Sequence, residues 1–359
     1  MLVRFLQVDG FRNLQSVSFE PSSQFNIFYG ENGAGKTSML EAIYYLGLAR
    51  SFRTSTLSRL IQTSADKLSL FARLQNATSV VPIGIERSLN GFRSIRYDGN
   101  KLTSIAPIAH LLPIQLISTD SYRYFHDGPK VRRQFLNWGL FHVEPLFFPL
   151  WQRLLQALKQ RNAALKTKQP SNQVCIWDEE LTETAEHIDK LRKDYVSQLQ
   201  PILHQLLSSI LKGIKLELRY SRGWSTEQSY LSALESNIYK DRAIGYTTTG
   251  PQRADLQLFI DDTPVQDLLS QGQQKLASYA LYLAQGLHLR EASAKTPIYL
   301  VDDLPSELDP EKRMLLTNVL SGLQAQVFIS GITTQDLQDS IQQEDAKLFH
   351  VKQGKLIEN

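Results

Sequence analysis

The stretch Gly30-Glu31-Asn32-Gly33-Ala34-Gly35-Lys36-Thr37 decides the fold of this chain. It follows an apolar run at residues 24–29 and precedes a helical pattern at residues 39–48. A glycine-rich loop between a strand and a helix can point backbone N–H groups at a phosphate, and the positive helix end strengthens that attraction. Lys36 is placed to neutralise the β- and γ-phosphates, and the Thr37 hydroxyl is placed to bind Mg²⁺. We therefore predict a site for ATP and Mg²⁺ at residues 30–37.

A second carboxylate for Mg²⁺ is expected after the apolar strand at residues 298–301, which ends in Asp302-Asp303. Asp302 is placed to ligate the metal, and Asp303 is placed to orient or deprotonate the attacking water. Because an Asp side chain is one methylene shorter than that of Glu, we expect slow hydrolysis. Gln115, on the predicted strand at 113–117, is a candidate third ligand for the metal or the water, with an ordinary solvated Gln as the alternative.

A third polar segment, Leu269-Ser270-Gln271-Gly272-Gln273-Gln274-Lys275, lies 27 residues before the acidic strand end. The Ser270 hydroxyl, the Gly272 N–H and the start of a helix together predict a second anion site. The alternative is a polar loop that only caps a helix. The three segments together favour the anion site.

The rest of the chain predicts an α/β protein with mixed sheets and one mostly helical insertion. Strand-like alternation with turn signals fills residues 68–99, and helical spacing of apolar residues fills about 121–212, with a kink expected at Pro201. Strands resume after residue 215. We predict a discontinuous nucleotide-binding head at 1–120 and 215–359, and a helical second lobe at 121–214. Sustained heptads are missing from the sequence, so no long coiled coil is expected.

Charge is distributed unevenly along the chain. The net charge is only +3, but residues 1–168 hold 21 Lys and Arg against 10 Asp and Glu, whereas residues 169–359 hold 18 against 26. Such asymmetry suggests a polyanion partner such as DNA, and charges spread over solvated faces are the alternative. The candidate contacts are basic residues of the helical part, some of which could only cap helices or form surface ion pairs: Arg123, Lys130, Arg132, Arg133, Arg153, Lys159, Arg161, Lys166 and Lys168.

Composition excludes several classes of protein. No segment approaches the ~20 consecutive apolar residues of a membrane span, so no membrane partner is expected. The first nine residues are too mixed for a signal peptide. The single cysteine, Cys175, excludes an internal disulfide and a multi-cysteine zinc site. A cytoplasmic location fits these features.

The three segments, in this order, resemble the ATP-binding-cassette ATPases, in which Ser270-Gln271-Gly272-Gln273 matches the signature sequence and Ser306-Glu307-Leu308-Asp309 the loop that joins two monomers. The 234 residues between Lys36 and Ser270 are too many for a transporter subunit and resemble the SMC branch. More specific segments resemble the RecF family of recombination mediators: Gly10-Phe11-Arg12-Asn13-Leu14, Gly128-Pro129-Lys130, Arg132-Arg133, Lys159-Gln160-Arg161-Asn162 and Thr249-Gly250-Pro251-Gln252-Arg253-Ala254-Asp255-Leu256.

The resemblance implies a head-to-tail homodimer around two ATP molecules. Ser270 of one copy, with Gly272 and Gln273, would contact the γ-phosphate held by Lys36 of the other, and Arg12 could reach a phosphate. Thr333 is the candidate for the γ-phosphate sensor, because the His that usually follows the last core strand of transporter-type cassettes is missing here. The family binds gapped, single-stranded and junction DNA, works with RecR and RecO to load recombinase, and belongs to the SOS response. Two other functions are the alternatives: a transport ATPase subunit, and a P-loop kinase of a small metabolite.

Overall fold

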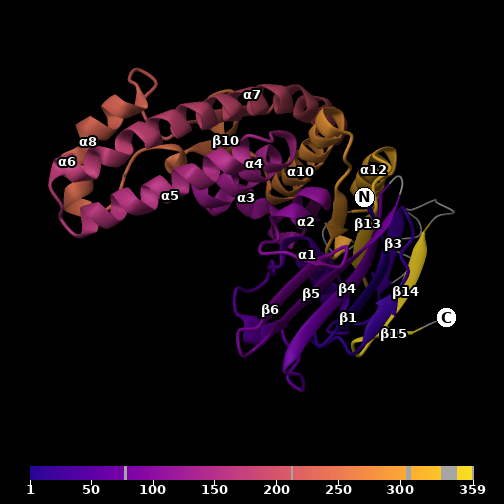
Figure 1. Ribbon diagram of the computed structural model, residues 1–359. Coiled ribbons are helices and arrows are strands. Elements are labelled where there is room, and N and C mark those ends of the chain that lie inside the picture. Colours follow the sequence, from indigo (N-terminus) through magenta and orange to yellow (C-terminus); the bar gives the residue numbers. More distant parts are fainter. Residues whose placement is uncertain (77–78, 212, 305–308, 333–345, 358–359) are drawn as a thin grey trace. The chain divides into compact units, whose positions relative to one another are not determined.

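The computed structural model describes residues 1–76, 79–211, 213–304, 309–332 and 346–357. Contacts between residues divide the chain into two compact units (Figure 1). Unit 1 comprises Met1–Ser121 and Leu289–Asn359, and unit 2 comprises Tyr122–His288. The first boundary lies next to the predicted one. We predicted that the head resumes at residue 215, whereas the contacts group residues 215–288 with the helices.

A mostly parallel sheet forms the centre of unit 1, in the strand order β15-β14-β3-β13-β12-β8. Its strands β3, β8, β12 and β13 are almost entirely buried, as their continuous apolar sequences require. Parallel strands end at a common edge, so the loops after β3, β12 and β13 converge. The bounds are β3 Phe25–Tyr29, β8 Ile114–Ile117, β12 Ile298–Val301, β13 Val327–Gly331, β14 Lys347–Lys352 and β15 Lys355–Ile357.

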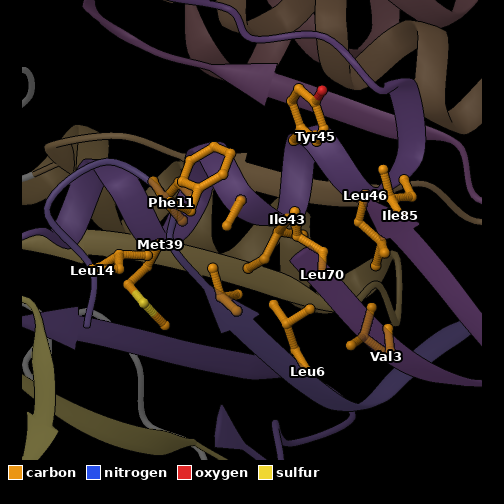
Figure 2. Close-up of a cluster of buried hydrophobic side chains, with 14 of the residues drawn as sticks. Val3, Leu6, Phe11, Leu14, Met39, Ile43, Tyr45, Leu46, Leu70 and Ile85 are labelled. Atoms are coloured by element: carbon orange, nitrogen blue, oxygen red, sulfur yellow. The ribbon is translucent and has the colours of Figure 1, made fainter. Parts of the chain in front are cut away.

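An antiparallel sheet, in the order β2-β1-β4-β5-β6-β7, is the second layer of unit 1. Its strands alternate between buried and exposed side chains, which is the pattern of a sheet with one solvent face. The buried face, including Leu6, Leu70 and Ile85, packs on Ile43 and Leu46 of α1 (Figure 2). The bounds are β1 Leu2–Asp9, β2 Val17–Phe19, β4 Lys67–Gln75, β5 Val80–Ser88, β6 Arg93–Tyr97, β7 Asn100–Lys101, α1 Lys36–Leu48, α2 Ala106–Leu111 and α12 Pro310–Gly322.

Unit 2 is mostly helical and contains a small sheet of its own, in the order β11-β10-β9. Pro201 lies inside α7 without ending that helix of 33 residues. Among the described residues, no helix is long and apolar enough to cross a bilayer. The bounds are α3 Arg123–His126, α4 Pro129–Val143, α5 Phe147–Lys166, α6 Ser171–Val174, α7 Asp178–Ile210, α8 Tyr230–Ile244, α9 Val265–Leu268, α10 Gln271–Ser293, β9 Glu217–Ser221, β10 Asp255–Ile260 and β11 Thr263–Pro264.

Candidate nucleotide site

The loop between β3 and α1 depends on glycine at two positions. Gly30 has a φ of 144°, and a Cβ there would lie 2.2 Å from the carbonyl oxygen of Val351. Gly35, with a φ of 117°, occupies the N-cap position of α1. Both conformations are rare for residues with a side chain. The loop therefore presents its backbone to the N-terminal end of a 13-residue helix, where an anion is attracted.

Lys36 is folded back onto this loop. Its ammonium Nζ donates to the carbonyl oxygens of Gly30, at 2.8 Å, and Glu31, at 2.9 Å. Burial lowers the pKa of Lys36, and the carboxylates of Asp303 and Asp302 oppose that shift. The two hydrogen-bond acceptors of Lys36 are uncharged carbonyl oxygens. Its ammonium group can therefore turn to a phosphate without leaving a charged acceptor unpaired.

Thr37 and Asp302 meet across the convergent strand ends. The Thr37 hydroxyl donates to Asp302 Oδ1 at 2.9 Å, and the Ser330 hydroxyl donates to the same oxygen at 2.7 Å. Burial raises the pKa of Asp302, while the hydrogen bonds from Ser330 and Thr37 oppose that rise. Asp303 has a left-handed φ of 54°, and its backbone N–H donates to Ser330 Oγ at 2.8 Å. This uncommon conformation turns the chain sharply after β12.

These side chains fit a magnesium ion. Mg²⁺ prefers oxygen ligands, keeps several waters, and uses one or two carboxylates together with substrate phosphates. Thr37 and Asp302 supply a hydroxyl and a carboxylate 2.9 Å apart. The remaining positions would be filled by water and phosphate oxygens. We predicted both residues as ligands, and the structure brings them together.

A cavity of about 1240 Å³ surrounds this group, and every residue that lines it belongs to unit 1. It reaches from the phosphate loop to the segment at residues 58–64. Several of the lining residues, Asn13 and Arg53 among them, were not predicted to belong to the site. Asn13 donates to the carbonyl of Gly33 at 3.1 Å and accepts from the Ser38 hydroxyl at 2.8 Å, so it fixes the loop. No feature of the sequence around Arg53, apart from its charge, indicated that it belongs to the site.

Arg12, predicted to reach a phosphate, lines the cavity but is already engaged. Its Nε and Nη2 donate to the two carboxylate oxygens of Glu41 at 2.9 and 2.6 Å. Its Nη1 donates to the carbonyl of Arg59 at 2.8 Å. Glu41 is completely buried, so it requires a cationic partner. Arg12 therefore neutralises the buried carboxylate of Glu41 in this structure.

Gln115, the candidate third ligand, lies in the middle of β8 opposite Tyr299 and is 3% exposed. It is not among the residues that line the cavity, whereas Thr119, two residues beyond the end of β8, is. The physical reason is strand geometry, because the convergent edge of a parallel sheet lies beyond the last residue of each strand. A search of the residues after residue 117 would have found Thr119.

The predicted second anion site lies in unit 2, at the start of α10. The Ser270 N–H donates to Gln273 Oε1 at 2.9 Å, and the Gln273 N–H donates to Ser270 Oγ at 3.3 Å. This reciprocal pair is a capping box. Ser270 and Gly272 are exposed, and a Cβ placed on Gly272 would meet nothing within 4 Å. Space for a ligand thus remains open above the helix start.

Two predicted elements lie outside the described residues. They are Thr333, the candidate γ-phosphate sensor, and residues 306–308 of the segment expected to join two monomers. Asp309, the last residue of that segment, caps α12 by accepting from the Lys312 N–H at 3.0 Å.

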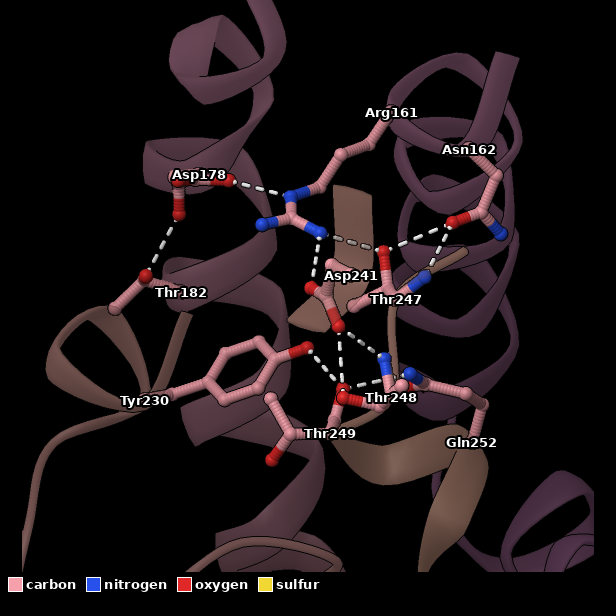
Figure 3. A network of polar contacts seen from close by, with 10 residues as sticks. All are labelled: Arg161, Asn162, Asp178, Thr182, Tyr230, Asp241, Thr247, Thr248, Thr249 and Gln252. Atoms are coloured by element: carbon pink, nitrogen blue, oxygen red, sulfur yellow. Dashed lines mark hydrogen bonds and ion pairs between the residues drawn. The ribbon is translucent and has the colours of Figure 1, made fainter. Parts of the chain in front are cut away.

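Two of the proposed DNA contacts must be corrected. Arg161 is fully buried and donates to Asp178, Asp241 and Thr247 at 2.7–2.8 Å (Figure 3). Arg132 is 7% exposed, and its Nε and Nη2 donate to both carboxylate oxygens of Asp255 at 2.7 and 2.9 Å. Each guanidinium is held by carboxylates inside unit 2 and is unable to face an external polyanion.

Three further predicted DNA contacts are more accessible. Arg133 is half-buried and donates to the carbonyl of Ala254 at 2.8 Å, and burial lowers its pKa, an effect that Asp255 opposes. Lys159 and Lys166 are exposed on α5. These three stay predictions.

Substituting Asp302 by Asn should raise the thermal stability of the protein without nucleotide at neutral pH. Burial raises the pKa of this carboxyl in the folded state, so its ionised form is disfavoured by folding. Such a group contributes stability below its unfolded pKa, and this contribution is lost as pH rises through the folded pKa. The gain from Asn should therefore shrink as the pH is lowered toward about 4. Melting curves without Mg²⁺ check this, and a gain independent of pH would contradict it.

Comparisons with known proteins agree with the geometry. The model of the RecF/RecN/SMC N-terminal domain family matches residues 2–356. The DNA replication and repair protein RecF of Coxiella burnetii, strain RSA 493, is 48% identical over 98% of both chains, and that of Aliivibrio salmonicida is 42% identical over the same shares. The solved RecF–ATP structure of the RecFOR pathway has a TM-score of 0.87, with 26% identity over 99% of this chain and 97% of that one.

The fold and the site define an ATPase head of the ATP-binding-cassette class, in its SMC-like form. An Smc head bound to the winged-helix domain of ScpA shares the fold, with a TM-score of 0.63 at 14% identity over 99% of this chain and 97% of that one. The chain belongs to the RecF family of DNA replication and repair proteins. The predicted fold class and the family resemblance are confirmed.

Proposed function

We propose that the cavity of unit 1 binds ATP with Mg²⁺. The observation that carries this proposal is the 2.9 Å contact between Thr37 and Asp302 beside the phosphate loop. A similar protein of known structure is named as a RecF–ATP complex, which supports the same ligand here. Bound Mg²⁺ would neutralise charge that builds up on the phosphates. In this arrangement Lys36 leaves the carbonyls of Gly30 and Glu31 for the phosphates.

Hydrolysis would be slow and would act as a switch. Asp303 follows Asp302 and lies at the cavity wall, where its carboxylate can orient an attacking water. Its short side chain and left-handed backbone restrict its reach. ATP hydrolysis would thus end the ATP-bound state and return the protein to its state before ATP binding, at a rate that DNA stimulates.

A second copy of the chain would complete the site. We propose that unit 1 is the head, that unit 2 is the second lobe, and that two copies associate head to tail when ATP is bound. Ser270 and Gly272 are exposed at a helix start that is able to receive an anion. The γ-phosphate held by Lys36 of the partner copy is the anion that fits. ATP then joins two subunits, and its hydrolysis separates them.

The dimer would act on DNA in recombinational repair and replication restart. Relatives named as DNA replication and repair proteins, and structures placed in the RecFOR pathway, support this function. The excess of Lys and Arg in residues 1–168 supports a polyanion partner. We propose that gapped or single-strand/double-strand junction DNA is bound with help from Lys159 and Lys166, and that RecO and RecR join in loading recombinase, in the cytoplasm, as part of the SOS response.

Substituting Ser270 by Arg should abolish ATP-dependent dimerisation and leave ATP binding by the monomer intact. The larger cation fills the space above the start of α10, whereas the cavity of unit 1 is not altered. Gel filtration with ATP and Mg²⁺ measures the dimer, and a fluorescent ATP analogue measures binding. Ser236→Arg, at an exposed position of α8, would control for added charge. A Ser270→Arg protein that dimerises with ATP would contradict the head-to-tail arrangement.

A further inference from the structure

The antiparallel sheet of unit 1 has a solvent face that the proposed function does not use. Leu70 and Ile85 lie on the face that packs on α1 (Figure 2), and the residues that alternate with them point the other way. The strand register aligns Phe71 of β4 with Gly84 of β5, and Gly84 with Arg96 of β6. This row crosses three neighbouring strands.

A shallow groove of about 480 Å³ follows this row, and its residues combine aromatic rings with an open floor. Phe71 and Phe92 are 37% and 50% exposed, which is unusual for rings of that size. Gly84 forms the floor, and a Cβ there would meet nothing within 4 Å. A flat ring can therefore lie over Gly84, beside Phe71. Pro82 lines the same groove.

Positive charge borders these rings. The guanidinium of Arg73 lies 5.4 Å from the ring centroid of Phe5, which itself packs edge-on against Phe71 at 6.2 Å. Arg96 lines the groove. Within the described parts of the chain, no carboxylate forms an ion pair with Arg73 or Arg96.

Two acidic residues of this face, Glu86 and Asp9, have partners of their own. Glu86 pairs with Lys67 at 3.3 Å. Asp9 accepts from the Ser16 hydroxyl at 2.5 Å and from the Gln7 side chain at 3.0 Å. Glu86 lines the groove and its charge is balanced by Lys67, and the exposed rings lie next to Arg73 and Arg96.

We propose that this groove binds a single strand of nucleic acid, with bases stacked on Phe71 and Phe92 and phosphates paired with Arg73 and Arg96. Stacking on aromatic side chains beside a basic track is how single strands are held without sequence preference. Strand spacing places Phe71 and Arg96 roughly 10 Å apart across β5, within the span of a short oligonucleotide. An intact duplex hides its base faces, so it would bind more weakly here. The proposal rests on the proposed function only in that the polymer is DNA.

The test measures binding of a labelled oligothymidylate to the full chain without nucleotide. Phe71→Ala should weaken binding at least about fivefold, because stacking contributes ~1–3 kcal/mol per base. Arg96→Ala should also weaken it and reduce the slope of log affinity against log salt by about 0.7. Arg93→Ala is the matched control, because Arg93 lies on the same strand but on the opposite face of the sheet, the face of the buried Ile95. Its affinity and slope should equal those of the wild type.

A second variant keeps the test valid if Phe71→Ala unfolds. Phe71→Trp retains a ring, and the fluorescence of this variant should be quenched by oligothymidylate well beyond that of the wild-type protein. Unchanged affinity of both Phe71→Ala and Arg96→Ala, or the absence of added quenching in the Phe71→Trp protein, would overturn the proposal. If only Lys159→Ala and Lys166→Ala weaken binding, the single strand is bound by unit 2. The groove proposal is then wrong, and the proposed function of the protein in binding DNA stands. If instead the protein binds oligothymidylate but does not dimerise with ATP, the groove proposal stands and the proposed ATP-dependent function is wrong.

Discussion

Replacing Asp303 by Asn is expected to lower the rate of ATP hydrolysis by about 100- to 10,000-fold, which is the usual contribution of a positioned general base. ATP-dependent dimerisation should persist or become longer-lived. The reason is that Asp303 lines the cavity, whereas the Thr37 hydroxyl donates to Asp302. The amide of Asn would keep the size of the side chain, and it would remove both the negative charge that acts on Lys36 and the ability to accept a proton. Phosphate release and gel filtration with ATP and Mg²⁺ measure the two effects.

Asp303→Glu serves as the matched control for this change. It retains the carboxylate and adds one methylene, so hydrolysis should be kept or accelerated, since a longer side chain reaches further toward the water. An Asp303→Asn protein that hydrolyses ATP at the wild-type rate would remove Asp303 from the mechanism. Loss of ATP binding in the same variant would show that Asp303 supports the nucleotide rather than the water.

The second large effect is expected from Arg161→Ala, which should destabilise unit 2 by about 3–5 kcal/mol. The substitution leaves Asp178, 3% exposed, and Asp241, completely buried, without their shared cation. The loop at residues 245–250 would also lose the bond from Arg161 to the Thr247 hydroxyl, and Asn162 would then hold Thr247 to α5 without it (Figure 3). Thermal unfolding should shift by roughly 6–20 °C, given ~2–4 °C per kcal/mol for a domain of this size.

Arg153→Ala, on the same helix, is the control. Its guanidinium pairs with Glu180 and Glu183 on the surface, where such pairs add little. No measurable change in melting temperature is expected. Equal melting temperatures for Arg161→Ala and the wild type would show that the buried network does not stabilise unit 2. DNA affinity that falls while stability is unchanged would return Arg161 to the list of DNA contacts.

The phosphate loop could be predicted from sequence because its chemistry is local. Eight adjacent residues, one strand and one helix specify it, and no distant partner is needed to place Lys36 and Thr37. Asp302 was predictable for a related reason, because an apolar run that ends in a carboxylate places that carboxylate at a sheet edge. Arg12 and Gln115 were less predictable, since their partners, Glu41 and the neighbours of β8, are set by tertiary packing.

The buried position of Arg161 was available in the sequence. Leu154, Leu158 and Leu165 gave the helical spacing of α5, and Arg161 falls three or four residues from its neighbours on that same stripe. A basic residue within an apolar stripe predicts a buried ion pair better than a DNA contact. The carboxylates that meet it, from α7 and α8, could not be assigned because their approach depends on how the helices pack.

The boundary near residue 215 shows a different limit. Strand character after that residue was correct, since β9 begins at Glu217. Strand partners are not encoded in the alternation of one segment, however. Strands β9, β10 and β11 pair only with each other in the described chain, so they stay with the helices of unit 2 rather than joining the sheets of unit 1.

The order of strands in the parallel sheet also determines when β3 can pair with its neighbours during synthesis. Strand β3, which carries the phosphate loop, is flanked by β13 and β14, which are made about 300 residues later. Ribosomes add roughly 5–20 residues per second. The two strands that pair with β3 are therefore synthesised some 15–60 seconds after it. During that interval the nascent chain exposes apolar strand edges that invite aggregation. A chaperone that shields residues 25–29 until translation ends would therefore raise the yield of folded protein.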